Sequence, residues 1–394
     1  MPNPTIDNRG TIAGPGMHVL LVGISEYPHL PDPANPPTPN TWNFKRLASP
    51  ALSAFRVYEW LIANEEFLRL PLKTVRMLLS PSALELAAAP GMAALGAPLA
   101  TRAEFGAAVA QWRKDASDHS DNVTMLYYGG HGLQRGPGES ILAFQDFGEP
   151  MVPKLNNCVR VSNIRAGMAP SAEFPTIAMT QFYFFDACRV VPDGIEKFDE
   201  LAIPDVFEVL LNFADHRNAP TYFATVDGAL AVARRGQMTA FCEALLDGLR
   251  RGAYQPKDVG GRVVWPISAA ALKDAIESYF SRRKIAQEIR LDGHGRDPEL
   301  LYLKSPPEVE FDVEFVPERV AGGGEFQLWD EGDQTKLHKV PIPQSPIFIT
   351  QSAGNYRVVV DSDQLLARYR SSIMWVTQRM TAPWRHDLTA SLKP

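Results

Sequence analysis

The sequence predicts an α/β domain with a mostly parallel sheet, followed by a small all-β domain. Up to about residue 305, short apolar runs bounded by turn or charged residues alternate with stretches of helical periodicity. This alternation is typical of parallel strands that are buried on both faces and connected by helices. After Pro306 and Pro307 the pattern changes, and apolar residues alternate strictly with acids in 309–316. A period of two predicts half-buried strands, so 306–394 is predicted to be a β-sandwich-like domain.

The predicted parallel strands are five apolar runs that are rich in β-branched or aromatic residues. They are residues 18–24, 73–79, 123–128, 181–186 and 221–226. Between them, apolar residues recur with the spacing of amphipathic helices, which would cover the two faces of the sheet. This spacing begins near residue 49 and returns around Val109, Leu245 and Ile276. Long loops are predicted for 28–40, 81–100 and 189–204.

Length, charge and cysteine content limit the classes of function. A chain of 394 residues suits two domains, and its net charge of −6, without a basic cluster, argues against binding to nucleic acid or to a membrane surface. The three cysteines, Cys158, Cys188 and Cys242, have neither metal-site nor disulfide-framework spacing, so we expect no metal site and a cytoplasmic location. Residues 1–16 are polar and carry Pro and Gly, which predicts a disordered N-terminus.

Two of the predicted strands run directly into reactive groups. The strand 123–128 leads to Gly-Gly-His131-Gly132, and the strand 181–186 leads to Ala-Cys188. If the strands are neighbours, His131 and Cys188 share the carboxyl edge of the sheet, where open α/β folds bind ligands. A thiolate is a strong nucleophile, and an adjacent imidazole can lower the pKa of the thiol and protonate the leaving amine. The backbone amides of Gly132 and Cys188 are the predicted oxyanion hole.

The segments YYGGHG (127–132) and FFDACR (184–189) together resemble the His and Cys motifs of the caspase, metacaspase and paracaspase clan. The His also precedes the Cys by a separation close to the ~50 residues of the caspase signature. The resemblance covers roughly 17–305 and leaves 306–394 unexplained. It implies a prokaryotic caspase homologue, with a mostly parallel six-stranded sheet flanked by helices. The implied activity is that of a cysteine endopeptidase on protein or peptide substrates.

The residues around Cys188 differ from those of caspases that cleave after Asp, because Asp186 and Val190 stand where those enzymes have Gln and Gly. An Asp at this position resembles metacaspases and paracaspases, which implies that Asp186 binds a substrate Arg or Lys in the primary pocket. The second acid of metacaspases is replaced here by Ser53, and Asp227 is the candidate substitute. The alternatives are that Asp186 only binds loop amides, that Asp227 is an exposed turn residue, and that cleavage follows Asp.

Regulation is also implied by the resemblance. Family members are often activated by cleavage after the nucleophile, which makes 189–204, with Lys197 inside it, a candidate activation segment for an upstream protease or regulator. By analogy we expect a role in a bacterial defence or cell-death cascade; calcium dependence is known in metacaspases, but the sequence does not support it, and no cofactor is predicted. The competing hypothesis is a latent or pseudo-protease interaction module. A third hypothesis keeps the enzyme and makes the β domain a regulatory module, in which 309–316 is an exposed edge that accepts a partner strand.

Overall fold

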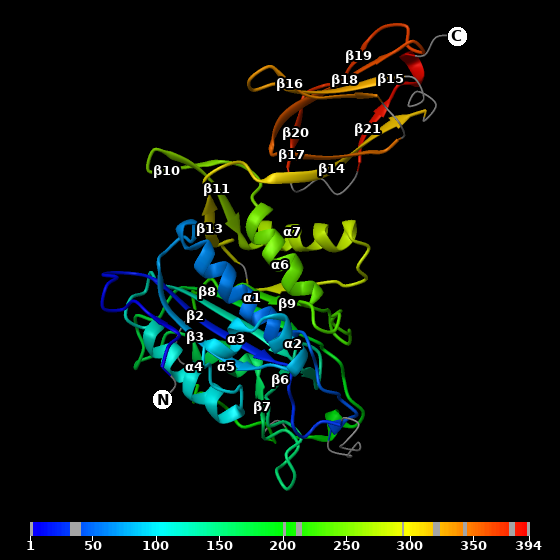
Figure 1. The fold of residues 1–394 in the computed structure, drawn as a ribbon. Helices are drawn as coiled ribbons and strands as arrows, with labels where there is room; N and C mark the ends of the chain where they lie inside the picture. The colour runs from blue at the N-terminus through cyan, green and yellow to red at the C-terminus, as the bar shows by residue number, and fades with distance from the viewer. Residues whose placement is uncertain are drawn as a thin grey trace. The chain divides into compact units, whose positions relative to one another are not determined.

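The computed structural model describes residues 3–31, 41–199, 202–209, 215–293, 295–317, 324–341, 345–377 and 383–391. The chain forms two compact units (Figure 1). The first comprises Met1–Leu246 and Arg283–Pro298, and the second Asp247–Arg282 and Glu299–Pro394. The domain boundaries 16/17 and 305/306 stay predictions. The predicted loops 28–40 and 189–204 each lie partly outside the described residues.

The first unit contains a seven-stranded sheet in the order β1-β3-β2-β4-β8-β9-β12. The five central strands are mutually parallel, and they confirm the five strands predicted from apolar runs. The edge strands β1 and β12 are antiparallel to their neighbours and are too short to be recognised as apolar runs. The strands are β1 (Ile6–Asp7), β2 (Met17–Ile24), β3 (Leu72–Ser80), β4 (Val123–Gly130), β8 (Thr180–Ala187), β9 (Thr221–Phe223) and β12 (Arg290–Asp292).

Helices cover both faces of this sheet, as predicted. Gly23 of β2 lies under helix α1 (Pro50–Ala63) so closely that an added Cβ would stand 2.7 Å from the Cα of Ala51. Helix α4 (Arg102–Ala116) packs on the opposite face, where its Trp112 joins one hydrophobic cluster with Leu20 and Val22 of β2. Helix α5 (Val161–Gly167) contacts a small antiparallel sheet formed by β5 (Gly132–Gln134), β6 (Ser140–Ala143) and β7 (Cys158–Arg160).

The predicted loop 81–100 contains two short helices, α2 (Ala83–Ala88) and α3 (Gly91–Ala94), so the prediction was wrong there. Ser82 and Glu85 form a reciprocal capping box at the start of α2. The buried Glu85 also accepts hydrogen bonds from the Ser25 hydroxyl at 2.8 Å and from the Leu52 amide at 3.0 Å. These long-range contacts explain why so short a helix forms without a clear apolar period.

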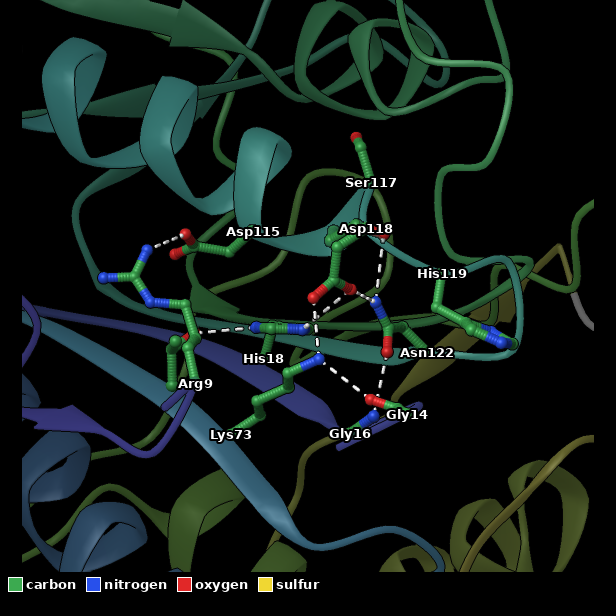
Figure 2. A network of polar contacts seen from close by, with 12 residues as sticks. Arg9, Gly14, Gly16, His18, Lys73, Asp115, Ser117, Asp118, His119 and Asn122 are labelled. Atoms are coloured by element: carbon green, nitrogen blue, oxygen red, sulfur yellow. Dashed lines mark hydrogen bonds and ion pairs between the residues drawn. The ribbon is translucent and has the colours of Figure 1, made fainter. Parts of the chain in front are cut away.

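The N-terminal segment is ordered over 3–16, where the sequence predicted disorder. Strand β1 pairs with β3, and Arg9 forms an ion pair at 2.8 Å with the buried Asp115, which also binds Arg76 of β3. Figure 2 shows the neighbouring contacts, in which the Lys73 ammonium donates to the Gly14 carbonyl and to the Asp118 carboxylate. Charged side chains therefore hold the N-terminal segment in place, although it has too few apolar residues to be held by hydrophobic packing alone.

The second unit combines a mixed α/β part with a β-sandwich-like part. Helix α6 (Ala240–Arg251) enters this unit from the first one, and it is followed by the antiparallel sheet β10-β11-β13 and helix α7 (Ala269–Arg282). The three strands are β10 (Lys257–Val259), β11 (Arg262–Ser268) and β13 (Glu299–Leu303). The periodicities around Leu245 and Ile276 thus correctly predicted α6 and α7.

Two further sheets confirm the predicted all-β region. Strand β14 (Glu308–Val316) alternates buried and half-buried residues, and Phe315 on it contacts Phe326 of the other sheet with ring centroids 6.0 Å apart. β14 lies between β17 and β21, so the idea that 309–316 is an exposed edge was wrong. The remaining strands are β15 (Gly324–Asp330), β16 (Thr335–Pro341), β17 (Ile347–Ser352), β18 (Gly354–Ser362), β19 (Tyr369–Arg370), β20 (Met374–Val376) and β21 (Trp384–Asp387).

Candidate active site

The register of two central strands brings His131 and Cys188 together. β4 and β8 are parallel neighbours, and their last paired residues are Gly130 and Ala187. The next residue on each strand is therefore His131 on one and Cys188 on the other, and adjacent strands lie ~4.8 Å apart. Both residues line a single cavity of about 1080 Å³ at the carboxyl edge of the sheet. The structure thus places the predicted pair where the sequence analysis expected it.

The imidazole of His131 is held from several sides. Its Nε2 lies 2.7 Å from the backbone carbonyl of Lys45, which can only accept, so Nε2 carries the proton and Nδ1 is the basic nitrogen. The ring of Phe44 stacks on the imidazole with centroids 4.8 Å apart, and the ring of Tyr27 contacts it at the same separation. The Tyr27 hydroxyl also accepts the backbone N–H of His131 at 2.9 Å. Burial lowers the pKa of His131 to about 4, so the imidazole is neutral at pH 7.

The segment that supplies the Lys45 carbonyl has an unusual backbone. Trp42 and Asn43 both adopt left-handed conformations, with φ of 47° and 58°. The Trp42 indole donates to the Asp193 carbonyl at 3.1 Å, and the Lys154 ammonium lies 3.7 Å from its ring centroid. These contacts fix the turn that directs the carbonyl at His131. Sequence reasoning missed this segment, because a backbone acceptor leaves no signature in residue type.

Cys188 is half-buried, and its sulfur accepts the backbone N–H of Ala231 at 3.2 Å. Burial raises the pKa of the Cys188 thiol, and the nearby Asp186 charge acts in the same direction. With His131 neutral, the resting pair is a neutral thiol and a neutral imidazole. The sequence had instead predicted that the imidazole would lower the pKa of the thiol. Gly132 packs against the same backbone, since an added Cβ would stand 2.3 Å from the Cys188 carbonyl oxygen. The oxyanion role of the Gly132 and Cys188 amides stays a prediction.

Asp186 lies beside this pair in the same cavity and is buried. Its Oδ2 accepts hydrogen bonds from the hydroxyl of Tyr127 at 2.6 Å and from the hydroxyl of Thr239. Its Oδ1 is buried and has no hydrogen-bond partner among the described residues. Burial raises the pKa of Asp186 to about 6. Of the described residues that line the cavity, Asp186 is the only acid.

Comparison with known proteins gives one family match and a set of similar solved structures. Residues 91–262, which include both motifs, match the family model of the caspase domain. Residues 91–262 are therefore similar to the caspase domain. Solved structures that resemble it include the crystal structure of caspase-1 from Spodoptera frugiperda, with 12% identity and a TM-score of 0.40. That similarity covers 75% of this chain and 94% of that one. A search of curated proteins finds no match.

The other candidates for the substrate pocket do not line the cavity. Asp227 forms ion pairs with the buried Arg189 and, at 3.4 Å, with Arg290, and it is not among the residues lining the cavity. The structure therefore does not bring Asp227 to Asp186, because a buried guanidinium holds its carboxylate elsewhere. Ser53 accepts the Thr239 amide at 3.0 Å and so supports a partner of Asp186 instead of adding a charge.

Two features of the described residues concern metals and membranes. Within the described ranges, no group of three or more His, Cys, Asp or Glu side chains is arranged to hold a metal ion. In the same part of the chain, the helices are too short or too polar to cross a membrane.

Proposed function

We propose that the caspase-like domain is a cysteine endopeptidase that cleaves protein substrates after Arg or Lys. Cys188 is the nucleophile, His131 the general base and then the general acid, and Asp186 the group that binds the basic side chain. The observation that carries this proposal is that the three residues line one cavity, in which Asp186 is the sole acid of the described lining. A buried carboxylate favours a cation and excludes acidic side chains.

The charges of the site suggest how the substrate starts the reaction. Burial and the charge of Asp186 both raise the pKa of the Cys188 thiol. A bound Arg or Lys side chain neutralises the field of Asp186, which removes one of these two causes. The thiol proton then passes to Nδ1 of His131 as sulfur attacks the carbonyl carbon. The resulting imidazolium is stabilised by the Lys45 carbonyl at Nε2, 2.7 Å away.

The second half of the reaction returns the site to its starting state. The imidazolium of His131 gives its proton to the leaving amine, and the C–N bond breaks to leave a thioester on Cys188. A water molecule, deprotonated by Nδ1 of His131, attacks the thioester and releases a carboxylic acid product, which loses its proton to solvent. The sulfur recovers the proton from the imidazolium. Each tetrahedral intermediate carries an oxyanion, for which the amides of Gly132 and Cys188 are the proposed donors.

Fluorogenic peptides that differ only in the residue before the scissile bond test the proposal. We expect cleavage of the Arg and Lys peptides, little of the Asp peptide, and no cleavage by Cys188→Ala. The matched control is Cys158→Ala, since Cys158 is a free, buried cysteine that does not line the cavity. Absence of all cleavage, also after limited proteolysis or added calcium, would instead support the interaction module. Cleavage of the Asp peptide alone would contradict the role of Asp186.

Activation by proteolysis is part of the proposal. Lys197 is exposed in a short 3-10 helix (Ile195–Lys197) within the predicted activation segment. The Asp193 carbonyl in this segment accepts the Trp42 indole N–H, so the segment touches the turn that orients His131. Cleavage of the chain after Lys197 is expected to change the peptidase activity. Lys197→Gln is expected to block this cleavage, which mass spectrometry of the chain can follow. The predicted place in a bacterial defence or cell-death cascade stays a prediction of the family resemblance.

A further inference from the structure

The two carboxylate oxygens of Asp186 are not equivalent. Oδ2 accepts two hydroxyl groups, those of Tyr127 and Thr239, which use both of its lone pairs. Oδ1 is buried without a hydrogen-bond partner among the described residues, and Asp186 lines the cavity. Oδ1 is therefore the one carboxylate oxygen of Asp186 that keeps free lone pairs for a bound cation.

The two donors are themselves fixed in place. The Tyr127 hydroxyl is buried, and burial raises its pKa far above the ordinary range, so it stays protonated and able to donate. The Thr239 hydroxyl also accepts the Cys242 amide at 3.1 Å in the first turn of α6, and the Thr239 amide donates to Ser53. A bound side chain would have to break these contacts to reach Oδ2.

This asymmetry affects arginine and lysine differently. The strength of an Arg–carboxylate pair lies in its fork, in which two parallel N–H groups bind two oxygens. With one oxygen free, a guanidinium places one of its five donors there and leaves four for the walls of the cavity. An ammonium has three donors and leaves only two. The described lining of the cavity includes apolar residues, among them Pro50, Ala187 and Leu230, and also the basic residues Lys45, Arg46 and Arg235.

We infer that Tyr127 and Thr239 determine the specificity of the site: by occupying Oδ2 they remove the advantage of arginine and make lysine the preferred residue before the scissile bond. The inference rests on the proposed function and narrows its substrate class to peptides cleaved after lysine. A guanidinium leaves two more N–H groups for the walls than an ammonium does, and one of them left unpaired corresponds to about a tenfold change, so the ratio of kcat/KM for Lys over Arg is expected to be about ten. Tyr127 and Thr239 act through Asp186 and are positioning residues.

The test compares kcat/KM for two peptides that differ only in Lys or Arg at this position. The variant is Tyr127→Phe, which deletes one hydroxyl and restores a lone pair on Oδ2. We expect the wild-type protein to favour Lys, and the variant to shift the ratio about tenfold towards Arg. The matched control is Tyr183→Phe, because Tyr183 is another buried tyrosine of the sheet, donates to Gln181 and does not line the cavity. Its ratio is expected to equal that of the wild type.

A second readout separates positioning from a general structural defect. The Tyr127 hydrogen bond lowers the pKa of Asp186, so its loss is expected to move the acidic limb of kcat/KM to higher pH. A merely structural defect would reduce both peptides equally and leave this limb in place. Thr239→Ser, which keeps the hydroxyl, is expected to preserve the ratio. If Arg equals or exceeds Lys in the wild type, or if the ratio is unchanged in Tyr127→Phe, the inference is overturned while the proposed protease stands. If neither peptide is cleaved, the proposed function and the inference fall together.

Discussion

Replacing Asp186 by asparagine tests the energetic consequence of burying an acid in the cavity. In the folded protein, burial raises the pKa of Asp186 from 3.8 to about 6. One pKa unit corresponds to about 1.4 kcal/mol, so the ionised carboxylate destabilises the fold by about 3 kcal/mol at neutral pH. Asparagine is neutral, and its side-chain oxygen can still accept the hydroxyls of Tyr127 and Thr239. Asp186→Asn is therefore expected to raise the free energy of unfolding by up to about 3 kcal/mol at pH 7.5.

The gain should depend on pH in a defined way. Below the unfolded-state value of 3.8, Asp186 is protonated in both states and contributes no difference. Between 3.8 and about 6 the unfolded chain loses the proton first, so the folded state becomes progressively less favoured. Above about 6 the full cost is present. The advantage of Asp186→Asn is thus expected to fall to about half of its maximum at pH 5.

Urea denaturation of both proteins from pH 5 to 7.5 measures these differences. Asp121→Asn is the control, since the Asp121 side chain is 79% exposed and its replacement should change stability by no more than about 0.5 kcal/mol. Cleavage of basic peptides by Asp186→Asn is expected to be lost, which separates stability from function at this residue. A variant that is no more stable than the wild type at pH 7.5, or whose gain does not vary with pH, would refute the reasoning.

Three further predictions concern the surroundings of the nucleophile. Asp227→Ala leaves the buried Arg189 without its main partner and is expected to lower the free energy of unfolding by about 1–2 kcal/mol, while the preference for basic peptides stays unchanged. If Asp227→Ala lost the preference for basic peptides, Asp227 would again be a candidate for binding the substrate side chain. Gly132→Ala places a Cβ 2.3 Å from the Cys188 carbonyl, so kcat is expected to fall by about 100-fold or more with an unchanged circular dichroism spectrum. Gly136→Ala, with no atom within 4 Å of the added Cβ, is its control and should retain activity. The rate of Cys188 alkylation by iodoacetamide can be followed by mass spectrometry. This rate is expected to keep rising beyond pH 9, because burial raises the pKa of the thiol. A plateau reached by pH 7 would instead indicate a preformed thiolate.

The sequence by itself determined the parallel core and the position of His131 and Cys188 at one edge of the sheet. Continuous apolar runs identify strands buried on both faces, and this information is local. His131 and Cys188 could be recognised because each follows such a run directly, and parallel strands end at the same edge of a sheet. The pocket role of Asp186 came only from the resemblance to metacaspases and paracaspases, which have an Asp at the position two residues before the nucleophile.

Tertiary structure decided what those residues can do. The carbonyl of Lys45 sets the tautomer of His131, and the Tyr127 and Thr239 hydroxyls leave one oxygen of Asp186 free. Pairing with Arg189 removes Asp227 from the pocket. The strand order also shows that 309–316, predicted to be an exposed edge, lies in the middle of a sheet. Each of these outcomes depends on partners distant in the chain. Hydrogen bonding, ion pairing and burial of a side chain depend on which groups meet in space, and a local pattern of residue types does not contain that information.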